Sequence, residues 1–511
     1  MSEMDRRNFL KTAAIAGAAV AGAGMLSACT TGEAASDIEW DMEADVVVVG
    51  AGGTGLAAAV EAVRSGVSVL VLEASESAGG TTAMSGGVVQ AAGTDEQKTI
   101  GKVEGDTPEK HAEYYIRCGE GLVDEELVKA FTAAAPEAIT WIKEQGVEFD
   151  VIYGNCHVPY AEDPGLLVDR IHSPKGGGGA GGGAVLTNAM FATAEDAGVT
   201  FEFSTRAVKL HTDGENGVIG LQADQGGTII NVKALRGVVL ATGGIDHNEE
   251  LARAICPQQY WDIKKETVIV APTNIGDGIV MGMGVNAALA TSGGTIDFCP
   301  KTGQATNNKM PQTPCIHVNK AGKRFVCEDA TYAYHYRAIY NQEMQLQGPT
   351  WMVMDQAGID SFGEANPFAA DMDGASGVLL KADSVEALAA AIEVPADALK
   401  HTLDEWNANI AATGKDPLFG RTYQLVEIKT GPFYAYKNVP MNLGAVGGLK
   451  INTDAQVIDL AGEPIPHLFC GGMNAGGWIG PYYPGSGTAV MGTMVLGRKA
   501  GASAAAAEPV A

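Results

Sequence analysis

The sequence is poor in positive charge. Its 34 lysine and arginine residues are set against 61 aspartate and glutamate residues, which gives a formal net charge of −27. No basic stripe of helix length offsets this acidity. Because an acidic surface repels the phosphate backbone, we expect no nucleic-acid partner.

The sequence also lacks the cysteine spacings of common metal and redox centres. Its eight cysteines are scattered, and none forms a CxxC or CxxCH pattern. This absence argues against c-type haem, a zinc ribbon or an iron–sulfur ladder, so we expect no metal site. Any redox chemistry would then require a separate electron donor or acceptor, either a quinone or a redox protein.

No early apolar run is long enough to span a bilayer as a stable helix. The stretch at residues 12–25 covers about 14 residues. It follows Arg6 and Arg7, whose flanking residues resemble a twin-arginine export signal, a route that carries folded proteins. The stretch ends in Leu-Ser-Ala-Cys, which resembles a lipoprotein cleavage site with Cys29 as the lipidated residue. An ordinary cleavage site between small residues is the alternative, so we expect a surface or periplasmic protein, with or without a lipid anchor.

The remaining composition indicates a globular protein of more than one domain. The chain has 511 residues, of which 46% are hydrophobic and 19% are charged. Its 67 glycines indicate many tight turns and close backbone approaches, which phosphate-binding folds require.

A complete strand–helix–strand unit follows the leader. Residues 45–49 are a β-branched run typical of a buried parallel strand, and the sequence GAGGTG follows at 50–55. An alanine-rich helix is predicted over 56–65 and a second strand over 68–72, which ends at Glu73. A GxGxxG pattern alone is weak evidence, but this context makes it a strong indication of a dinucleotide-binding fold.

Each glycine of the GxGxxG pattern has a physical role. Gly50 permits the tight turn, Gly52 lets the backbone approach a pyrophosphate, and Gly55 lets the helix close on the strand. The helix N-terminus presents free N–H groups to the phosphates. Glu73 would accept hydrogen bonds from ribose hydroxyls. The alternative is a glycine loop without a ligand.

Four later segments favour FAD as the cofactor. They are GGTTAMSGG at 79–87, VVLATGG at 238–244, LFCGGMNAGG at 468–477 and GSGTA at 485–489. Taken in order, they resemble the fumarate reductase/succinate dehydrogenase flavoprotein family over nearly the whole mature chain. Members of that family that bind flavin covalently carry a histidine in the first segment. None occurs there in this chain, so the resemblance implies non-covalent FAD.

The resemblance also implies a set of cofactor contacts. The helix that opens at 485–489 would place its N-terminus near the flavin pyrimidine and stabilise reduced, anionic flavin. The implied FAD-binding residues are Gly50, Gly52, Gly53, Thr54, Gly55, Glu73, Ala74, Gly80, Thr81, Thr82, Ser85, Gly86, Gly87, Ala207, Val208, Thr242, Gly243, Asp277, Asn474, Ser486, Gly487, Thr488, Ala489 and Val490.

The family architecture implied here is an α/β fold in which an α+β capping domain interrupts a Rossmann-like FAD-binding domain. We expect a signal at residues 1–29, a linker at 30–43, the FAD-binding domain at 44–271 and 431–508, and the capping domain at 272–430. The glycine-rich run at 176–183 has two interpretations. It is either a mobile surface loop or a loop that closes over flavin or substrate.

Four positions argue against a fumarate or succinate site. Fumarate reductases bind the dicarboxylate with histidine and arginine side chains and use an arginine as the proton donor. The corresponding positions here hold Cys299 and Pro300, Tyr332, the segment at 443–448 without histidine, and Pro484. A dianionic substrate would lose its charge-assisted hydrogen bonds at this site.

The replacements resemble the 3-ketosteroid dehydrogenase branch of the family. That resemblance implies that the Tyr483 hydroxyl and the Gly487 N–H hold a ketone oxygen while Tyr332 transfers a proton. Tyr153 or Tyr160 would assist. The segments that carry the resemblance, besides Tyr332, are YPGSG at 483–487, NIGDG at 274–278 and FCP at 298–300.

This constellation makes chemical sense, although it leaves alternatives open. Negative charge develops on a carbonyl oxygen when the adjacent carbon loses a proton, and two donors stabilise that charge. Tyrosine, with a pKa of about 10, needs neighbours that favour phenolate before it can act as a base. Tyr332 could instead only pack within its aromatic cluster. Three functions therefore remain: an oxidoreductase of an apolar ketone or enone, a respiratory reductase of another unsaturated acid or aromatic, and a surface flavin electron carrier.

Overall fold

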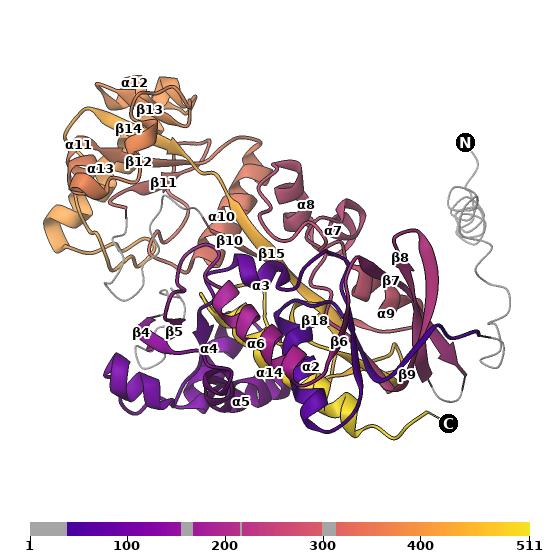
Figure 1. Cartoon of the computed structure of the whole chain (residues 1–511). Coiled ribbons are helices and arrows are strands. Elements are labelled where there is room, and N and C mark those ends of the chain that lie inside the picture. Colours follow the sequence, from indigo (N-terminus) through magenta and orange to yellow (C-terminus); the bar gives the residue numbers. More distant parts are fainter. Residues whose placement is uncertain (1–37, 155–166, 215–216, 299–312, 511) are drawn as a thin grey trace, which may run out of the picture. The chain divides into compact units, whose positions relative to one another are not determined.

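The computed structural model describes residues 38–154, 167–214, 217–298 and 313–510 (Figure 1). Within the chain, Trp40–Ala511 form one compact unit and residues 1–39 are a separate one. Several expectations fall outside the described residues: those on the signal, Arg6, Arg7, Cys29, Tyr160, Cys299 and Pro300. In the ranges that are described, no helix is both long enough and apolar enough to cross a membrane.

The predicted strand–helix–strand unit is present and forms the centre of the largest sheet. Strand β1 (Met42–Val49) pairs in parallel with β2 (Val69–Leu72) on one side and with β9 (Thr228–Leu240) on the other. Residues 46–49 of β1 are at most 3% exposed, because a parallel strand is covered on both faces. The continuous valine run in the sequence is the direct consequence of that double burial.

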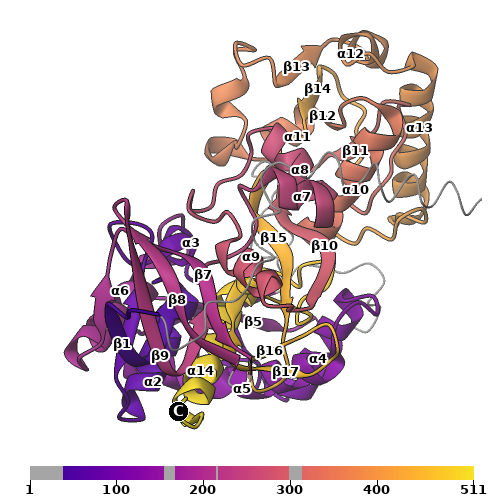
Figure 2. The same cartoon turned by 90° about the vertical axis from the view of Figure 1, so that its right-hand side faces the viewer.

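The order of this sheet is β16-β17-β9-β1-β2-β6. Strand β8 pairs antiparallel with β9, and β7 pairs antiparallel with β8, so the two extend the sheet beside β9 (Figure 2). Strand β17 is parallel to β9, and β6 is parallel to β2, whereas β16 is antiparallel to β17. The bounds of these strands are β6 Thr200–Glu202, β7 Thr205–Asp213, β8 Gly217–Gln225, β16 Gln456–Ile458 and β17 Pro464–Cys470.

Two helices pack closely beside this sheet because small residues line their contact. They are α2 (Gly53–Arg64) and α14 (Thr488–Ala506). A Cβ added at Gly497 would lie 2.5 Å from the Thr54 carbonyl oxygen, and one at Gly501 would lie 2.2 Å from that of Ala58. Only glycine allows this approach, which brings the N-terminal part of the chain against its last helix.

The capping region has its own antiparallel sheet, in the order β11-β12-β14-β13 (orange in Figure 1). The strands are β11 Ile316–Val318, β12 Trp351–Asp355, β13 Leu379–Ala382 and β14 Phe433–Lys437. Helices α12 (Val385–Ala391) and α13 (Ala396–Thr413) share a hydrophobic core with this sheet. The α/β architecture with a capping domain is therefore confirmed.

The pairing of strand β14 (Phe433–Lys437) concerns the predicted C-terminal boundary of the capping domain. The predicted boundary lies after residue 430, with the following segment leading back to the cofactor. Residues Phe433–Lys437 instead pair with β12 and β13, in the middle of the capping sheet. We therefore propose that the capping domain extends to Lys437, because a boundary inside a sheet would break its backbone hydrogen bonds.

Two smaller sheets connect these regions. Strands β10 (Leu289–Phe298) and β15 (Met441–Lys450) pair antiparallel, and β18 (Ala475–Gly476) adds to β15. Strands β3 (Val89–Gln90), β5 (Asp169–Pro174) and β4 (Phe149–Gly154) form the other. The remaining α-helices are α3 Gly80–Met84, α4 Pro108–Cys118, α5 Glu125–Glu144, α6 Ala184–Asp196, α7 Glu249–Ile255, α8 Pro257–Lys264, α9 Asp277–Gly284, α10 Tyr332–Leu346 and α11 Gln356–Asp360.

A pair of buried carboxyl groups joins α8 to β10. Asp262 and Asp297 have no exposed surface, and each carboxyl group shifts the pKa of the other. Asn442 donates to Asp262 at 2.9 Å, and Gln258 donates to Asp297 at 2.7 Å. Burial, and then the charge of Asp297, raise the pKa of Asp262 far more than the hydrogen bond from Asn442 and the charge of Lys265 lower it. We therefore expect Asp262 to hold the proton and to donate a hydrogen bond to Asp297.

The variant Asp262→Asn is expected to be more stable than the native protein at pH 8, with a gain that shrinks toward pH 5. The native pKa is raised on folding, so the stability that protonation contributes is complete below the unfolded pKa of about 3.9 and is lost as pH rises through the folded value. An asparagine at position 262 can accept from Asn442 and donate to Asp297, and its amide group does not ionise. The difference should grow by up to about 1.4 kcal/mol per pH unit, measured as the free energy of unfolding against pH.

The exposed Asp196 offers a matched control for this experiment. Asp196→Asn should change stability little and without this pH dependence. A gain for Asp262→Asn that is equal at pH 5 and pH 8 would contradict the protonated state of the pair.

Candidate active site

The glycine loop between β1 and α2 forms a cradle in which side chains have no room. Gly50 has a φ of +104°, and a Cβ there would lie 2.5 Å from the Ala241 carbonyl oxygen. A Cβ on Gly55 would lie 1.7 Å from the Gly50 carbonyl oxygen. Helix α2 begins at Gly53 with Gly52 as its N-cap, so the N–H groups of its first turn, apart from that of Gly53, which the Thr82 hydroxyl accepts, are available to the space above the loop.

Glu73 stands at the end of β2, beside this loop, and is 7% exposed. One carboxylate oxygen accepts from the Ala51 N–H at 2.7 Å, and the other accepts from the Ser75 N–H at 2.8 Å. The second oxygen also accepts from the Ser75 hydroxyl, so these bonds fix the carboxylate at the rim of the cavity, and the oxygen bound by Ala51 keeps a lone pair for a further donor. The position is the one predicted for an acceptor of ribose hydroxyls.

The segment at 79–87 lies against the loop and is fixed from two sides. The Thr82 hydroxyl accepts from the Gly53 N–H at 3.2 Å. The Thr81 hydroxyl accepts from the Ala271 N–H at 3.0 Å and from the Asn274 side chain at 3.1 Å. Short α3 is thereby tied both to the phosphate loop and to the chain that leads into α9.

The glycine-rich run at 176–183 packs on this same segment. The N–H groups of Gly178, Gly181 and Gly183 donate to the carbonyl oxygens of residues 86, 84 and 85, at 2.8 to 2.9 Å. A Cβ on Gly183 would lie 1.8 Å from the Thr82 carbonyl oxygen, so glycine is required for this contact. The run is mostly exposed and also contributes Gly178, Gly179 and Ala180 to the lining of the cavity, so its closing over flavin or substrate stays a prediction.

These elements surround one cavity of about 440 Å³. Most of the predicted site residues line it: Gly50, Gly52, Gly53, Thr54, Glu73, Ala74, Gly80, Thr81, Thr82, Ser85, Gly86, Gly87, Ala207, Thr242, Gly243, Asp277, Tyr332, Tyr483, Ser486, Gly487, Ala489 and Val490. Strand ends, loops and helix starts that are far apart in sequence thus meet at one place.

Four predicted residues do not line the cavity, for reasons that the backbone explains. Gly55 lies under the loop, as its spacer role requires. Val208 follows Ala207 on a strand and so points to the other face, where it is 44% exposed. Asn474 is buried and accepts from the Thr242 hydroxyl at 3.0 Å, while Thr488 is buried behind the turn at 485–487.

Tyr153, named with Tyr160 as a possible assisting residue, also lines the cavity. Other lining residues were not predicted as site residues, among them Gly178, Arg206, Asp246, Asn274, Ile296, Phe298, Met441 and Leu443. Asn274 and Phe298 carried a signal, since they lie in segments that resemble the family. Arg206 and Asp246 had none, because their neighbours come from distant strands. Arg206 forms an ion pair with Asp277. Burial raises the pKa of Asp246, against hydrogen bonds from the Ala445 N–H and the Asn274 side chain.

The two predicted catalytic tyrosines meet at one end of the cavity. Tyr332 is 5% exposed and Tyr483 is 3% exposed, and their ring centroids lie 5.9 Å apart. The Phe298 ring approaches Tyr332 edge-on, with centroids 6.3 Å apart. Phe298 pairs with Met441 across β10 and β15, which places an apolar wall beside the tyrosines.

The Tyr483 hydroxyl lies over the N-terminus of α14. It accepts from the Ala489 N–H at 2.7 Å, and Gly487 is the N-cap of the helix. Burial raises the pKa of Tyr483 well above its ordinary value, more than these helix N–H groups lower it. The hydroxyl therefore stays protonated at neutral pH and can donate a hydrogen bond.

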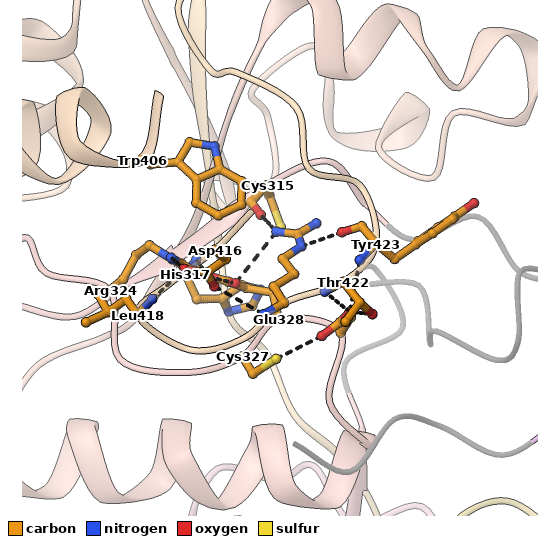
Figure 3. A network of polar contacts seen from close by, with 12 residues as sticks. Cys315, His317, Arg324, Cys327, Glu328, Trp406, Asp416, Leu418, Thr422 and Tyr423 are labelled. Atoms are coloured by element: carbon orange, nitrogen blue, oxygen red, sulfur yellow. Dashed lines mark hydrogen bonds and ion pairs between the residues drawn. The ribbon is translucent and has the colours of Figure 1, made fainter. Parts of the chain in front are cut away.

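A buried network of ions fixes the chain just before Tyr332 (Figure 3). Arg324 binds both oxygens of Glu328, at 2.9 and 2.6 Å, and both oxygens of Asp416, at 3.0 and 2.9 Å. Asp329 accepts from the Thr422 N–H at 2.7 Å. These bonds tie residues 324–329 to the loop at 416–423, so the start of α10, where Tyr332 stands, is rigidly placed.

The charge of the cavity is unsuited to a dicarboxylate. Among the described residues that line it, Arg206 is the one lysine or arginine, and Asp277 already neutralises it. Glu73 and Asp246 add further acidic groups. A dianion bound here would therefore be desolvated without a cationic partner.

Comparison with known proteins gives consistent matches. The family model described as FAD binding domain matches residues 45–490, and that of the twin-arginine translocation pathway signal matches residues 3–24. Digoxin reductase of Eggerthella lenta is 31% identical, over 99% of this chain and 98% of its own. Urocanate reductase of the same organism is 33% identical, over 91% and 75%. The crystal structure of 3-ketosteroid-Δ4-(5α)-dehydrogenase from Rhodococcus jostii RHA1 has a TM-score of 0.78 and 30% identity, covering 93% of this chain and all of that one.

The cavity itself fits FAD. The glycine cradle leaves space for a pyrophosphate at the N-terminus of α2, and Glu73 offers acceptors where a ribose would lie. The cofactor segment at 79–87 contains no histidine that could form a covalent bond to flavin. With a family model matched along most of its length, this chain belongs to the FAD-binding family of fumarate reductase and succinate dehydrogenase flavoproteins and is an oxidoreductase that binds FAD non-covalently.

Proposed function

We propose that this enzyme adds or removes hydrogen across a carbon–carbon bond next to a ketone, on an apolar substrate. The observation that carries the proposal is the meeting of Tyr332, Tyr483 and the Gly487 amide at one end of the cavity, beside Phe298 and Met441. An apolar wall with a few donors aimed at one point is the arrangement that recognises a hydrophobic ketone.

Each protein group has a distinct task in this proposal. Bound FAD supplies the site for hydride transfer. The protonated Tyr483 hydroxyl and the Gly487 N–H donate hydrogen bonds to the ketone oxygen and stabilise the negative charge that develops on it. Tyr332 moves the proton at the carbon next to the carbonyl group. Neither donor needs to reorganise, because both lie at the start of helix α14, and the capping-domain network holds Tyr332 in place.

Similar proteins support this class of substrate. The solved Rhodococcus jostii structure, which is 30% identical, is a complex with 4-androstene-3,17-dione, a steroid with two ketones. Urocanate reductase, at 33% identity, supports the alternative of an unsaturated small acid. The ion-paired state of Arg206 disfavours that alternative here, because no other cation lines the described cavity.

A panel of substrates tests the proposal. The flavin is reduced under anaerobic conditions and mixed separately with steroid enones, simple cyclic enones, fumarate and urocanate. We expect rapid reoxidation, followed by flavin absorbance, with at least one apolar enone and slow reoxidation with the carboxylates. Fast reoxidation by a carboxylate alone would favour the respiratory reductase. No reoxidation by any member would favour the electron carrier.

Export determines which membrane anchor and which electron partner the protein can use. The twin-arginine signal directs the chain across the membrane, and we propose that a lipid on Cys29 then anchors it to the membrane surface. We also propose a separate quinone or redox protein as electron partner, because the sequence carries no haem or iron–sulfur motif.

A further inference from the structure

We propose that Gln90 is a positioning residue that aims the Gly487 amide N–H at the substrate. This inference rests on the proposed function, because it assigns a support to the amide that would hold the ketone oxygen. Gln90 is on β3, has no exposed surface and does not line the cavity. Its action on a ligand would therefore pass through the turn at 485–487.

The hydrogen bonds of Gln90 fix the peptide unit between Ser486 and Gly487. Its side-chain Nε2 donates to the Ser486 carbonyl oxygen at 2.8 Å. Its backbone N–H donates to the Gly487 carbonyl oxygen at 3.3 Å. The turn is thus held at two successive carbonyl groups by one residue that is 396 positions away in the sequence.

The direction of the Gly487 N–H follows from peptide geometry. The Ser486 carbonyl and the Gly487 N–H belong to the same trans peptide, in which the two bonds point in opposite directions. When Gln90 holds the carbonyl on the β3 side, the N–H points away from β3. Gly487 lines the cavity, and no protein acceptor lies within reach of its N–H in the described part of the chain. The amide is therefore available to a ligand.

The Gln90 side chain is itself held at its other end. Its Oε1 accepts from the Tyr115 hydroxyl at 3.1 Å and bonds with the His111 ring at 3.2 Å. Because the Ser486 carbonyl can only accept, Nε2 must face it, and the Tyr115 hydroxyl fits the remaining oxygen. The amide is therefore locked in one orientation.

The turn needs such a restraint because glycine supplies none. Gly485 and Gly487 have φ values of +118° and +90°, and glycine peptides rotate easily. A stiffer residue does not fit at Gly487, since a Cβ there would lie 2.8 Å from the backbone of Val89. Rigidity therefore has to come from a neighbour, and Gln90 has a side chain of the required length and chemistry.

The test compares Gln90→Met and Gln90→Glu with the control His111→Phe. Methionine keeps the volume but removes the side-chain hydrogen bonds to Ser486, Tyr115 and His111, and glutamate keeps the acceptor while it loses the amide donor. His111→Phe removes a bond to Oε1 and leaves the donor. We measure turnover on an accepted enone, FAD content, and the affinity for para-substituted phenols, whose phenolates imitate the enolate.

Both Gln90 variants should retain FAD and lose about tenfold to a hundredfold in turnover, somewhat less than the loss of a whole oxyanion donor. Phenol affinity should also depend less steeply on the pKa of the phenol, which a purely structural role would not change. The control His111→Phe should keep near-native turnover and the native dependence of phenol affinity on phenol pKa.

If both Gln90 variants keep the native turnover and the native dependence of phenol affinity on phenol pKa, the inference is overturned while the proposed function still stands. Loss of FAD from both variants would also overturn it, since Gln90 would then maintain the fold. If the native enzyme reduces no enone or ketone and binds no phenolate, the proposed function fails first.

Discussion

Replacing Tyr332 by phenylalanine is expected to lower turnover about a hundredfold or more while FAD content stays native. The change removes one hydroxyl and keeps the ring, so the contacts with Phe298 and Tyr483 survive. The loss has the scale of a removed general acid or base. Steady-state turnover and single-turnover reoxidation of reduced flavin with an accepted enone measure it.

Tyr334→Phe is the matched control. Tyr334 lies two residues further along α10, and its ring packs against Tyr482 with centroids 5.2 Å apart. It does not line the cavity, so its hydroxyl should not matter for turnover. Near-native turnover of Tyr332→Phe on every accepted substrate would show that the proton comes from elsewhere, and the tyrosine would then only pack against the wall.

Tyr483→Phe tests the second predicted catalytic tyrosine, whose hydroxyl would donate to the ketone oxygen. Loss of this donor should lower turnover and weaken ketone binding. The double variant with Tyr332→Phe should lose less than the product of the two single losses, because both hydroxyls act on one transition state. Strictly multiplicative losses would indicate that the two groups act in separate steps.

The part of the fold that could be predicted is the part in which sequence neighbours are also neighbours in space. The strand at 45–49, the glycine loop and Glu73 form one local unit, so composition and spacing suffice to place them. The requirement for glycine at position 55 is equally local, because a Cβ there would clash with the carbonyl oxygen of Gly50. Cofactor residues from distant segments were predicted only through resemblance to a family.

The unpredicted parts depend on contacts across long stretches of chain. Strand β14 continues from a loop, and only its pairing with β12 and β13 shows that it belongs to the capping sheet. Gln90 has no motif of its own, because its partner is the turn beside Gly487. The carboxyl pair of Asp262 and Asp297 likewise has no sequence signal, since its pKa shifts arise from burial.

Export provides the other large expected effect. Replacing both Arg6 and Arg7 by lysine should leave nearly all of the protein in the cytoplasm, folded and with FAD bound. The twin-arginine signal at residues 3–24 keeps its positive charge in this variant. It loses the planar guanidinium groups, whose paired donors a point-charge ammonium group cannot reproduce.

Cell fractionation with an immunoblot, together with flavin fluorescence of the purified cytoplasmic protein, measures the outcome. Lys11→Arg, a conservative change a few residues downstream in the same signal, should be exported like the native chain. Retention of a flavin-loaded enzyme distinguishes failed export from failed folding, because an unfolded chain would lose FAD. If the double-lysine variant reaches the cell surface at the native level, the chain does not depend on the arginine pair, and the cofactor need not be bound before transport.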